Sequence, residues 1–386
     1  MAILAPEAGP TRSVGQKEVA LYSETEYFSA LIRDVNSTKS GDRIGIMTMS
    51  FEPSEPAVNK LVERLYAAAD RKVEVVLGID AFTFLVDDSR KTVGPLWLPL
   101  PFGQDAYRHR LAALDRLSVK PSGSYGVINK PSGYLSNPYS GRSHLKTAVV
   151  NDKVYLGGPN LHMTDRSDMV VGLEDPEVAD WLFSLTKNVV EAERTSDVLG
   201  DADRSIEVDG NTRILLDSGT PGESLILDEA ARLIAEAREG LIASFQYFPD
   251  GKVADELINA HRRGASVRPF FKHPDRHNLV LGIHQRLAMM LARSRMPGSF
   301  FANVVPVDAP VLHSKAIASE RAAMVGSHNY VTKGVKYGTP EIALLREDPV
   351  FARAVGDLLL KQARAVSPEP ELEMLLTPAP REVLST

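Results

Sequence analysis

Apolar residues near the start of the chain are spaced alternately for helices and for strands. The first helical stretch spans 23–36 and opens with a capping box, in which Ser23 and Glu26 satisfy backbone N–H groups of the first turn. The elements predicted after it are a strand at 43–51, a helix from Ser54 to Leu65 with Pro56 in its first turn, and a strand at 73–79. This β-α-β order favours parallel pairing of the two strands.

The second part of the chain repeats this order. The elements predicted there are a helix at 225–237, a strand at 240–247, a helix at 253–263 and a strand at 266–271. A Glu-Asp-Pro sequence opens a further helix in each part, at Glu174 and again at Glu347. Matching elements in matching order indicate an internal duplication.

Two stretches interrupt the repeated pattern. Residues 81–143 are rich in Pro and Gly and contain an apolar run, Trp97 to Phe102, and one short predicted helix near 107–117. Such a stretch is either a lid or binding loop, or an insertion that covers the core. The other interruption is a polar segment at about 195–211, which we interpret as a linker between the two parts.

These patterns predict an α/β protein made of two similar halves, each a mixed β-sheet flanked by helices. The predicted division is a first half at 1–200 with an insertion at about 81–143, a second half at 201–366, and a flexible Pro- and Glu-rich tail at 367–386.

Composition limits the classes of function. The 386 residues are 44% hydrophobic and 24% charged, which is typical of a globular protein. The net charge of −6 disfavours non-specific coating of nucleic acid, which requires many Lys and Arg contacts to phosphates. Because the chain has no cysteine, disulfides and thiolate metal sites are excluded. With no signal peptide and no run of about 18 apolar residues, we expect a cytoplasmic protein that is at most peripheral to a membrane.

One motif occurs twice, once in each half. The first copy is His144-Leu145-Lys146 followed by Gly157-Gly158-Pro159-Asn160, and the second is His313-Ser314-Lys315 followed by Gly326-Ser327-His328-Asn329. In both copies the Asn lies 16 positions after the His. The intervening residues form an apolar strand, a polar turn and a second strand. This order predicts a hairpin that folds the Asn back beside the His and the Lys.

The residue types of the motif suit a phosphate group. On a strand, a His and a Lys two positions apart share one face, so a ring nitrogen and an ammonium point the same way. Reaction at a phosphodiester needs a nucleophile, a proton donor for the leaving oxygen, and fixed donors around the other phosphate oxygens. Two His, two Lys and two Asn supply these three roles. The spacing of the His residues matches no metal-binding motif, so we predict no metal.

The doubled motif resembles that of the phospholipase D superfamily, which is His-x-Lys, four residues, an Asp, and then Gly-Ser or Gly-Gly with an Asn. The resemblance covers about residues 20–365. It implies two halves related by a pseudo-twofold axis, with both motifs meeting in one shared active site. It also implies a covalent phosphohistidine, formed without a metal or any other cofactor.

The resemblance assigns roles to residues of both copies. One of His144 and His313 attacks phosphorus, while the other protonates the leaving alcohol and activates the incoming water or alcohol. Family precedent favours His144 as the nucleophile, although the halves are too alike for the sequence alone to assign it. Asp168 and Glu341, each at the start of an apolar run, are the candidate carboxylates that orient the histidines. The groups expected around the phosphate are Lys146, Lys315, Asn160, Asn329, Ser327 and Gly158.

The chain departs from the family motif at a few positions. Asn151 and Glu320 stand where the family has Asp, at a position expected to be structural. The first copy has Gly158-Pro159 where the second has Ser327-His328, so the first copy lacks a hydroxyl at this position. Lys272 and His328 are further candidates for contact with the substrate, and His328 is also a candidate for packing the turn.

The stretch from Gly326 to Glu341 resembles the cardiolipin synthase-related and bacterial phospholipase D-like branch. We therefore expect a phosphodiesterase or phosphatidyltransferase with a phospholipid substrate and water or an alcohol as acceptor. The alternative is a metal-independent nuclease. A non-catalytic scaffold is disfavoured because both copies keep every His, Lys and Asn of the motif. Neither the acceptor nor the oligomeric state follows from the sequence. A nuclease requires a basic groove from residues such as Lys120, Lys130, Arg142, Lys272 and Arg276.

Overall fold

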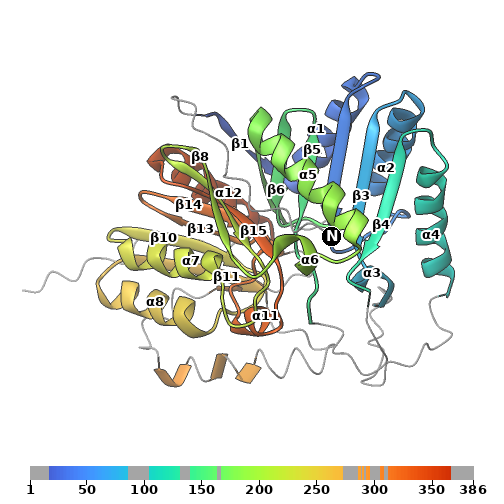
Figure 1. The fold of residues 1–386 in the computed structure, drawn as a ribbon. Helices are drawn as coiled ribbons and strands as arrows, with labels where there is room; N and C mark the ends of the chain where they lie inside the picture. Colours follow the sequence, from blue (N-terminus) through green and yellow to red (C-terminus); the bar gives the residue numbers. More distant parts are fainter. Residues whose placement is uncertain are drawn as a thin grey trace, which may run out of the picture.

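The computed structural model describes residues 17–85, 104–130, 140–162, 167–272, 286–287, 289–290, 293–295, 305–307 and 312–366. The Trp97 to Phe102 run, Arg276 and the predicted tail lie outside the described residues. Strands and helices follow one another in two successive series (Figure 1). No helix in the described ranges combines the length and apolar character needed to cross a membrane.

The first series confirms the helices and strands predicted for residues 23–79, with shifts of a few residues at their ends. The predicted capping box is present, because the carboxylate of Glu26 accepts hydrogen bonds from the backbone N–H and the hydroxyl of Ser23 at 2.9 and 2.7 Å. The elements are β1 (Val19–Ser23), α1 (Glu24–Ser37), β2 (Arg43–Thr48), α2 (Pro56–Asp70), β3 (Glu74–Asp80), α3 (Phe82–Leu85), α4 (Gln104–Ser118), β4 (Gly123–Ile128), β5 (Thr147–Val150), β6 (Lys153–Gly157), β7 (Met169–Glu174), α5 (Pro176–Ala192) and α6 (Ser196–Leu199).

The second series confirms the repeated order of elements. Its members are β8 (Arg204–Asp209), β9 (Thr212–Asp217), α7 (Leu225–Glu236), β10 (Gly240–Phe245), α8 (Gly251–Arg262), β11 (Ser266–Lys272), β12 (Val305–Val307), β13 (Ala316–Ser319), β14 (Ala323–Gly326), α11 (Thr332–Lys336), β15 (Glu341–Arg346) and α12 (Pro349–Val366). The segment at 195–211, predicted to be a polar linker, contains α6 and also β8, which is a strand of the second sheet. Alternate residues of β8, Ile206 and Val208, are buried in the core.

Each series forms one mixed sheet, and the two sheets share a strand order. The first sheet is ordered β1-β7-β6-β5-β2-β3-β4, and the second β12-β11-β10-β13-β14-β15-β9-β8. In each sheet three parallel strands (β2, β3, β4 or β10, β11, β12) adjoin three antiparallel ones (β5, β6, β7 or β13, β14, β15). β1 and β9 occupy matching places, and β8 is an extra edge strand. The duplication predicted from the sequence is therefore a duplication of the fold.

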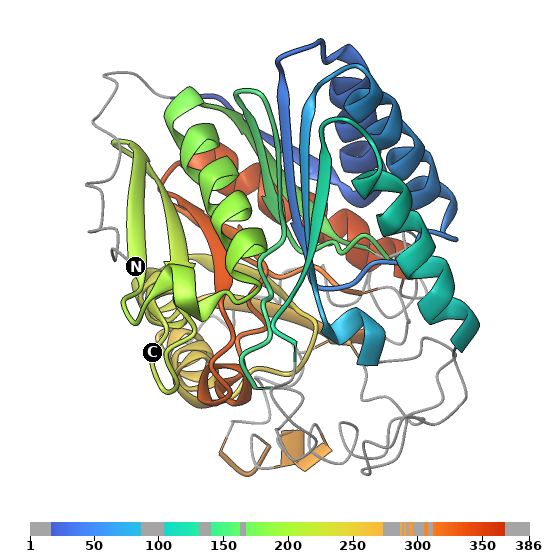
Figure 2. The same cartoon turned by 45° about the vertical axis from the view of Figure 1, so that its right-hand side comes forward.

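The sheets and helices form layers around a shared central core (Figures 1 and 2). This core contains buried apolar side chains of α5, α12 and both sheets. A second core lies between the first sheet and helices α1 and α2, and a third between the second sheet and helices α7 and α8. Strands β6 and β7 lie next to β14 and β15 across the interface. Burial of apolar surface therefore holds the two halves together, and with them any site that lies between the halves.

Glycines in the first sheet allow α5 to pack closely. A Cβ atom at Gly45 would lie 3.0 Å from the ring of Phe183, and one at Gly126 would lie 2.9 Å from Val190. A residue with a side chain would push the helix away. Gly126 belongs to β4, which lies within the predicted irregular stretch at 81–143. The prediction of a loop is wrong for β4, because its glycines serve helix packing within a parallel strand.

Candidate active site

The two His-x-Lys segments directly precede β5 and β13. The prediction that they lie within strands is therefore wrong by a few residues. The expected proximity still holds, since each Lys folds back to its own His. The Nζ of Lys146 donates to the carbonyl oxygen of His144 at 3.2 Å, and the Nζ of Lys315 donates to that of His313 at 2.7 Å.

The predicted hairpins are present and join the two parts of each motif. Strand β5 pairs with β6, and β13 pairs with β14, both antiparallel. Just past the ladders, the N–H of Gly157 lies 3.4 Å from the carbonyl oxygen of Lys146, and the N–H of Gly326 lies 3.1 Å from that of Lys315. These contacts place the Gly and Asn segments beside the His and Lys segments.

Backbone hydrogen bonds cross between the halves in a reciprocal pattern. The N–H of His144 donates to the carbonyl oxygen of Pro340 at 2.9 Å, and the N–H of His313 donates to that of Ser167 at 3.1 Å. The residue after Pro340 is Glu341 and the residue after Ser167 is Asp168. Each half therefore presents its candidate carboxylate to the histidine of the other half.

The side chains complete this exchange. The Nδ1 of His313 lies 2.5 Å from Oδ2 of Asp168, and the Nδ1 of His144 lies 2.8 Å from Oε1 of Glu341. The second contact is an ion-pair approach, since the Nδ1 of His144 has no partner with hydrogen-bond geometry among the described residues. In both histidines the carboxylate is at Nδ1, on the opposite side of the ring from Nε2, and the Nε2 of His313 lies 3.3 Å from the Nζ of Lys315.

Glu341 is ionised in this setting. Burial alone would raise its pKa, but the charges of His144, His328 and Lys146 and the contact with His144 outweigh burial and lower the pKa to about 2. The hydroxyl of Ser327 donates to its other oxygen. An ionised carboxylate at Nδ1 fixes the orientation of the His144 ring and stabilises its positive charge.

Both motif lysines and the amide oxygens of both motif asparagines are buried. Lys146 and Lys315 are 5% and 1% exposed. Burial lowers the pKa of Lys146, although Glu341, Asp168 and Asp80 act against this shift. The amide oxygens of Asn160 and Asn329 are buried and have no hydrogen-bond partner among the described residues. A buried amide oxygen without a partner is unusual in a folded protein, and it suits a group that contacts a ligand.

Gly158 makes room for Asp168. A Cβ atom at Gly158 would lie 2.7 Å from Cγ of Asp168 and closer still to Oδ1. The corresponding Ser327 instead donates its hydroxyl to the longer Glu341. The first copy therefore has glycine where the second has Ser327, because the Asp168 carboxylate occupies the volume that a side chain at position 158 would need.

Two candidate contact residues have different placements. His328 is 3% exposed, and its Nδ1 accepts the N–H of Tyr330 at 2.8 Å. Burial lowers the pKa of His328 to about 4, partly opposed by Glu341, so the ring is neutral near pH 7. This placement matches the turn-packing interpretation. Lys272 ends β11, and its side chain lies outside the described part of the structure.

The two residues in place of the family Asp anchor the hairpin turns. The N–H of Arg43 donates to the side-chain oxygen of Asn151 at 3.1 Å. Glu320 accepts the N–H of Arg238 at 2.9 Å. Each side chain therefore ties its hairpin turn to the chain at or just before a neighbouring strand, as the expected structural role requires.

Sequence reasoning missed Asp80, which lies behind the first motif. Its fully buried carboxylate accepts from the N–H of Ser143 and from Asn129 Nδ2, both at 2.8 Å, and from Arg142 at 3.2 Å. Asp80 thereby holds the segment that leads into His144. The signal that could have identified Asp80 is a charged residue at the end of a strand of apolar residues.

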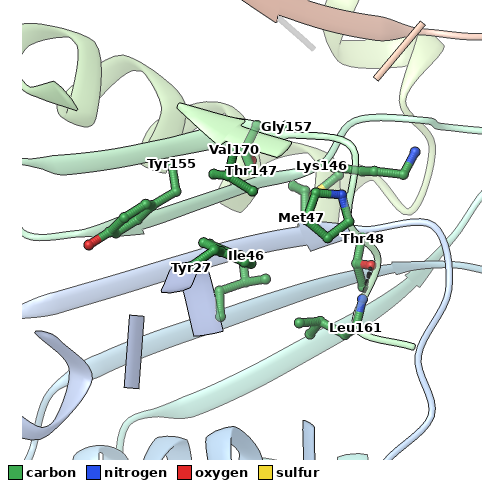
Figure 3. A pocket seen from close by; sticks show the side chains of 11 residues that line it. Tyr27, Ile46, Met47, Thr48, Lys146, Thr147, Tyr155, Gly157, Leu161 and Val170 are labelled. Atoms are coloured by element: carbon green, nitrogen blue, oxygen red, sulfur yellow. Dashed lines mark hydrogen bonds between the residues drawn. The ribbon is translucent and has the colours of Figure 1, made fainter. Parts of the chain in front are cut away.

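A small cavity of about 10 Å³ lies beneath Lys146 and has room for about one water molecule (Figure 3). Tyr27, Thr48 and Tyr155 are among its lining residues, and the ammonium of Lys146 points away from them. The cavity is too small for a substrate. No cluster of three or more described His, Asp or Glu residues has the arrangement of a metal site.

Asp217, also missed, is the ladder partner of Glu341 and is 2% exposed. Burial raises its pKa from 3.8 to about 7. The Ser224 hydroxyl and the Ile226 N–H donate to its carboxylate and lower the pKa, while Asp203 and Glu341 raise it further. Two carboxylates at facing positions of one ladder disfavour a second negative charge.

We predict that Asp217→Asn is more stable than the wild type, by an amount that grows between pH 4.5 and pH 8. The folded protein keeps a proton on Asp217 that the unfolded chain releases above pH 3.8, so the free energy of unfolding falls as pH rises from about 4 to about 7. Asn retains the shape of the protonated acid and cannot ionise. A shift of about three pKa units sets an upper bound of about 4 kcal/mol on the difference, measured by urea unfolding.

Asp209→Asn is the control, for which we expect a change in the free energy of unfolding of the opposite sign. Burial would raise the pKa of Asp209, but the backbone N–H groups of Lys17 and Asn211, at 2.8 and 2.9 Å, contribute to lowering it. The charged form therefore stabilises the fold above pH 4, and the variant should be less stable than the wild type at pH 8. A stability change in Asp217→Asn that does not vary with pH would contradict the prediction.

Comparison with known proteins agrees with this architecture. The family model described as "Cardiolipin synthase, PLD-like domain" matches residues 231–359. No curated protein matches the chain. The crystal structure of phosphatidylserine synthase from Haemophilus influenzae Rd KW20 is similar with a TM-score of 0.64 and 14% identity, covering 94% of this chain and 93% of that one.

Two further solved structures are similar. Polyphosphate kinase from Porphyromonas gingivalis has a TM-score of 0.53 and 13% identity, covering 90% of this chain and 50% of that one. Nuc, a phospholipase D family member from Salmonella typhimurium, has a TM-score of 0.31 and 17% identity, covering 39% of this chain and 92% of that one. The family match thus lies in the second half of the chain, and the fold match to phosphatidylserine synthase extends over both halves.

Proposed function

We propose that the protein is a phospholipase D-like phosphodiesterase or phosphatidyltransferase that acts on phospholipids through a covalent phosphohistidine. The observation that carries this proposal is the exchange of carboxylates, in which each motif histidine has a buried carboxylate from the opposite half at its Nδ1. Two imidazoles that are each oriented through Nδ1, with Nε2 on the opposite side of the ring, are what a two-step displacement at phosphorus requires.

In the first step, Nε2 of His144 attacks phosphorus and the bond from phosphorus to the alcohol oxygen breaks. The Nε2–H of His313 gives its proton to that oxygen. In the second step, Nε2 of His313 takes a proton from water or an alcohol, whose oxygen attacks phosphorus and releases His144. Either acceptor fits this scheme, so the products decide between hydrolysis and transfer.

Two features support His144 as the nucleophile. Its side chain is 19% exposed, whereas that of His313 is 7% exposed, so the His144 ring is easier for phosphorus to approach. The carboxylate of Asp168 is closer to its histidine than that of Glu341, at 2.5 against 2.8 Å. A close carboxylate suits the histidine that must hold a proton before the first step.

The remaining motif residues are suited to stabilise the phosphate charge. The ammonium groups of Lys146 and Lys315 contact their own histidines, and each hairpin brings the segment that contains Asn160 or Asn329 alongside. Fixed donors in a largely buried site stabilise a negatively charged transition state more strongly than the same groups do in water. We propose that these groups replace a metal ion in the reaction.

The comparisons and the surface charges support phospholipid over nucleic acid. Both the matching family model and the phosphatidylserine synthase carry names that concern phospholipid synthesis. The described candidates for a basic groove are paired with acids: Lys120 with Asp70 at 2.8 Å, Lys130 with Glu193 at 2.9 Å and Arg142 with Asp80 at 3.2 Å. Paired cations contribute less to phosphate binding along a strand. A phospholipid substrate entails peripheral contact with a membrane surface.

The proposal is tested by incubating the purified protein, with and without a chelator, with phosphatidylglycerol vesicles and separately with single- and double-stranded DNA. Mass spectrometry of the products is the readout. We expect chelator-resistant conversion of the lipid, to phosphatidic acid if water is the acceptor or to a lipid carrying a second phosphatidyl group if an alcohol is. Cleavage of DNA alone would replace the proposal with the nuclease alternative, and no reaction with either substrate would reject it.

A further inference from the structure

Gln362 is a polar residue on the buried, apolar side of α12. Its neighbours on that side are Val355, Leu359 and Ala363, each about 1% exposed or less, and Gln362 itself is 7% exposed. The fourteenth residue of α12 is Gln362, and the fourteenth residue of the matching α5 is Val189, which is fully buried. An apolar residue is therefore sufficient for packing at this position of the helix. Packing alone does not account for the buried amide of Gln362.

Both ends of the Gln362 amide are paired with residues of the candidate site. The Nε2 donates to the carbonyl oxygen of Asp168 at 2.8 Å, and the Oε1 lies 2.7 Å from the hydroxyl of Ser314. A carbonyl oxygen only accepts, so the orientation of the amide is determined by Asp168. The Ser314 hydroxyl has one proton, which it shares between Gln362 and the carbonyl oxygen of Ser167, also at 2.7 Å.

These contacts span the interface between the halves at one histidine. Asp168 belongs to the first half and Ser314 to the second, and the Asp168 side chain contacts His313, the neighbour of Ser314. The backbone N–H groups of His313 and Ser314 donate to the carbonyl oxygen of Ser167 at 3.1 and 3.0 Å. Gln362 thus links the main chain of Asp168 to Ser314, while the Asp168 side chain contacts His313, the neighbour of Ser314.

We propose that Gln362 is a positioning residue for His313. By holding the main chain of Asp168 against Ser314, it keeps the Asp168 carboxylate at Nδ1 of His313 as the proton moves on and off Nε2. Val189, at the matching position of α5, is apolar and cannot make these hydrogen bonds near His144. The positioning contact therefore serves only His313 of the two motif histidines. The role of His313 in this inference rests on the proposed function.

The test compares Gln362→Met with Leu359→Met. The first variant keeps the length and helix preference of Gln and removes both amide contacts, while the second alters packing one turn earlier on the same face. We expect Gln362→Met to lower kcat for phosphatidylglycerol conversion about 10-fold with KM unchanged within twofold, because a small displacement of a catalytic group mainly affects the transition state. Leu359→Met should leave kcat within twofold.

A second readout does not depend on activity. In a His144→Asn background, the titration midpoint of the His313 ring nitrogens, followed by NMR, should move to lower pH in Gln362→Met and also in Ser314→Ala, because the Asp168 carboxylate is held less firmly. Ser314→Ala keeps the test decisive if Gln362→Met does not fold. Absence of lipid turnover would count against the proposed function only, whereas an unmoved midpoint in the folded variants would overturn the positioning role.

Discussion

His144→Asn and His313→Asn should each reduce phosphatidylglycerol conversion by about 10⁴-fold or more, as expected when a nucleophile or its acid-base partner is removed. Asn keeps a polar group near the position of Nδ1 and removes Nε2, so the neighbouring carboxylate retains a partner and the fold is little affected. The double variant should be hardly worse than either single variant, because the two histidines act as one unit. Mass-spectrometric assays of initial rate provide the measurement.

The same variants separate the two roles. A phosphodiester with a nitrophenolate leaving group needs little protonation, so His313→Asn should release about one equivalent of nitrophenol in a burst and then stop with phosphate attached to His144. His144→Asn should give no burst. His109→Asn, on the exposed face of α4, is the control and should behave as the wild type. A burst in His144→Asn alone would reverse the assignment, and substantial activity in both variants would reject the mechanism.

Gly158→Ser is expected to lower kcat by about 100-fold or more while the protein remains folded. Its Cβ atom would lie 2.7 Å from Cγ of Asp168, so the carboxylate must move away from His313. A displacement of about 1 Å at a catalytic group costs on the order of 100-fold in rate. The change is in the position of an orienting group, so kcat should fall more than KM rises.

Ser327→Gly is the matched control, because it converts the second copy of the motif to the first. It removes one hydroxyl donor to Glu341 without any steric conflict, and we expect a loss of about 10-fold or less. Asp168→Ala and the double variant Gly158→Ser/Asp168→Ala should have equal activity, since serine at 158 acts only through Asp168. If Gly158→Ser is as active as Ser327→Gly, Gly158 does not make room for the carboxylate.

Several features of the fold and the site could be predicted from local sequence pattern. The capping box at Ser23, the alternation of helices and strands, and the two hairpins each depend on residues close together in the chain. The loop and linker predictions failed at β4 and β8. In β4, Gly126 makes room for α5 and Gly123 for α4, and these glycines give the strand the composition of a loop. In β8, alternating burial places polar residues at every second position of a half-exposed edge strand.

The sequence by itself determined that the chain is duplicated, that each copy has His, Lys and Asn at equal spacing, and that the doubled motif resembles that of the phospholipase D superfamily. The tertiary structure alone decided which carboxylate serves which histidine, why position 158 is glycine, and that Asp217 and Gln362 adjoin the site. The physical reason is distance along the chain. Asp168 and His313 are 145 positions apart, and Asp168 and Gln362 are 194 apart. Contacts of that span exist only after the two sheets have docked through their apolar core.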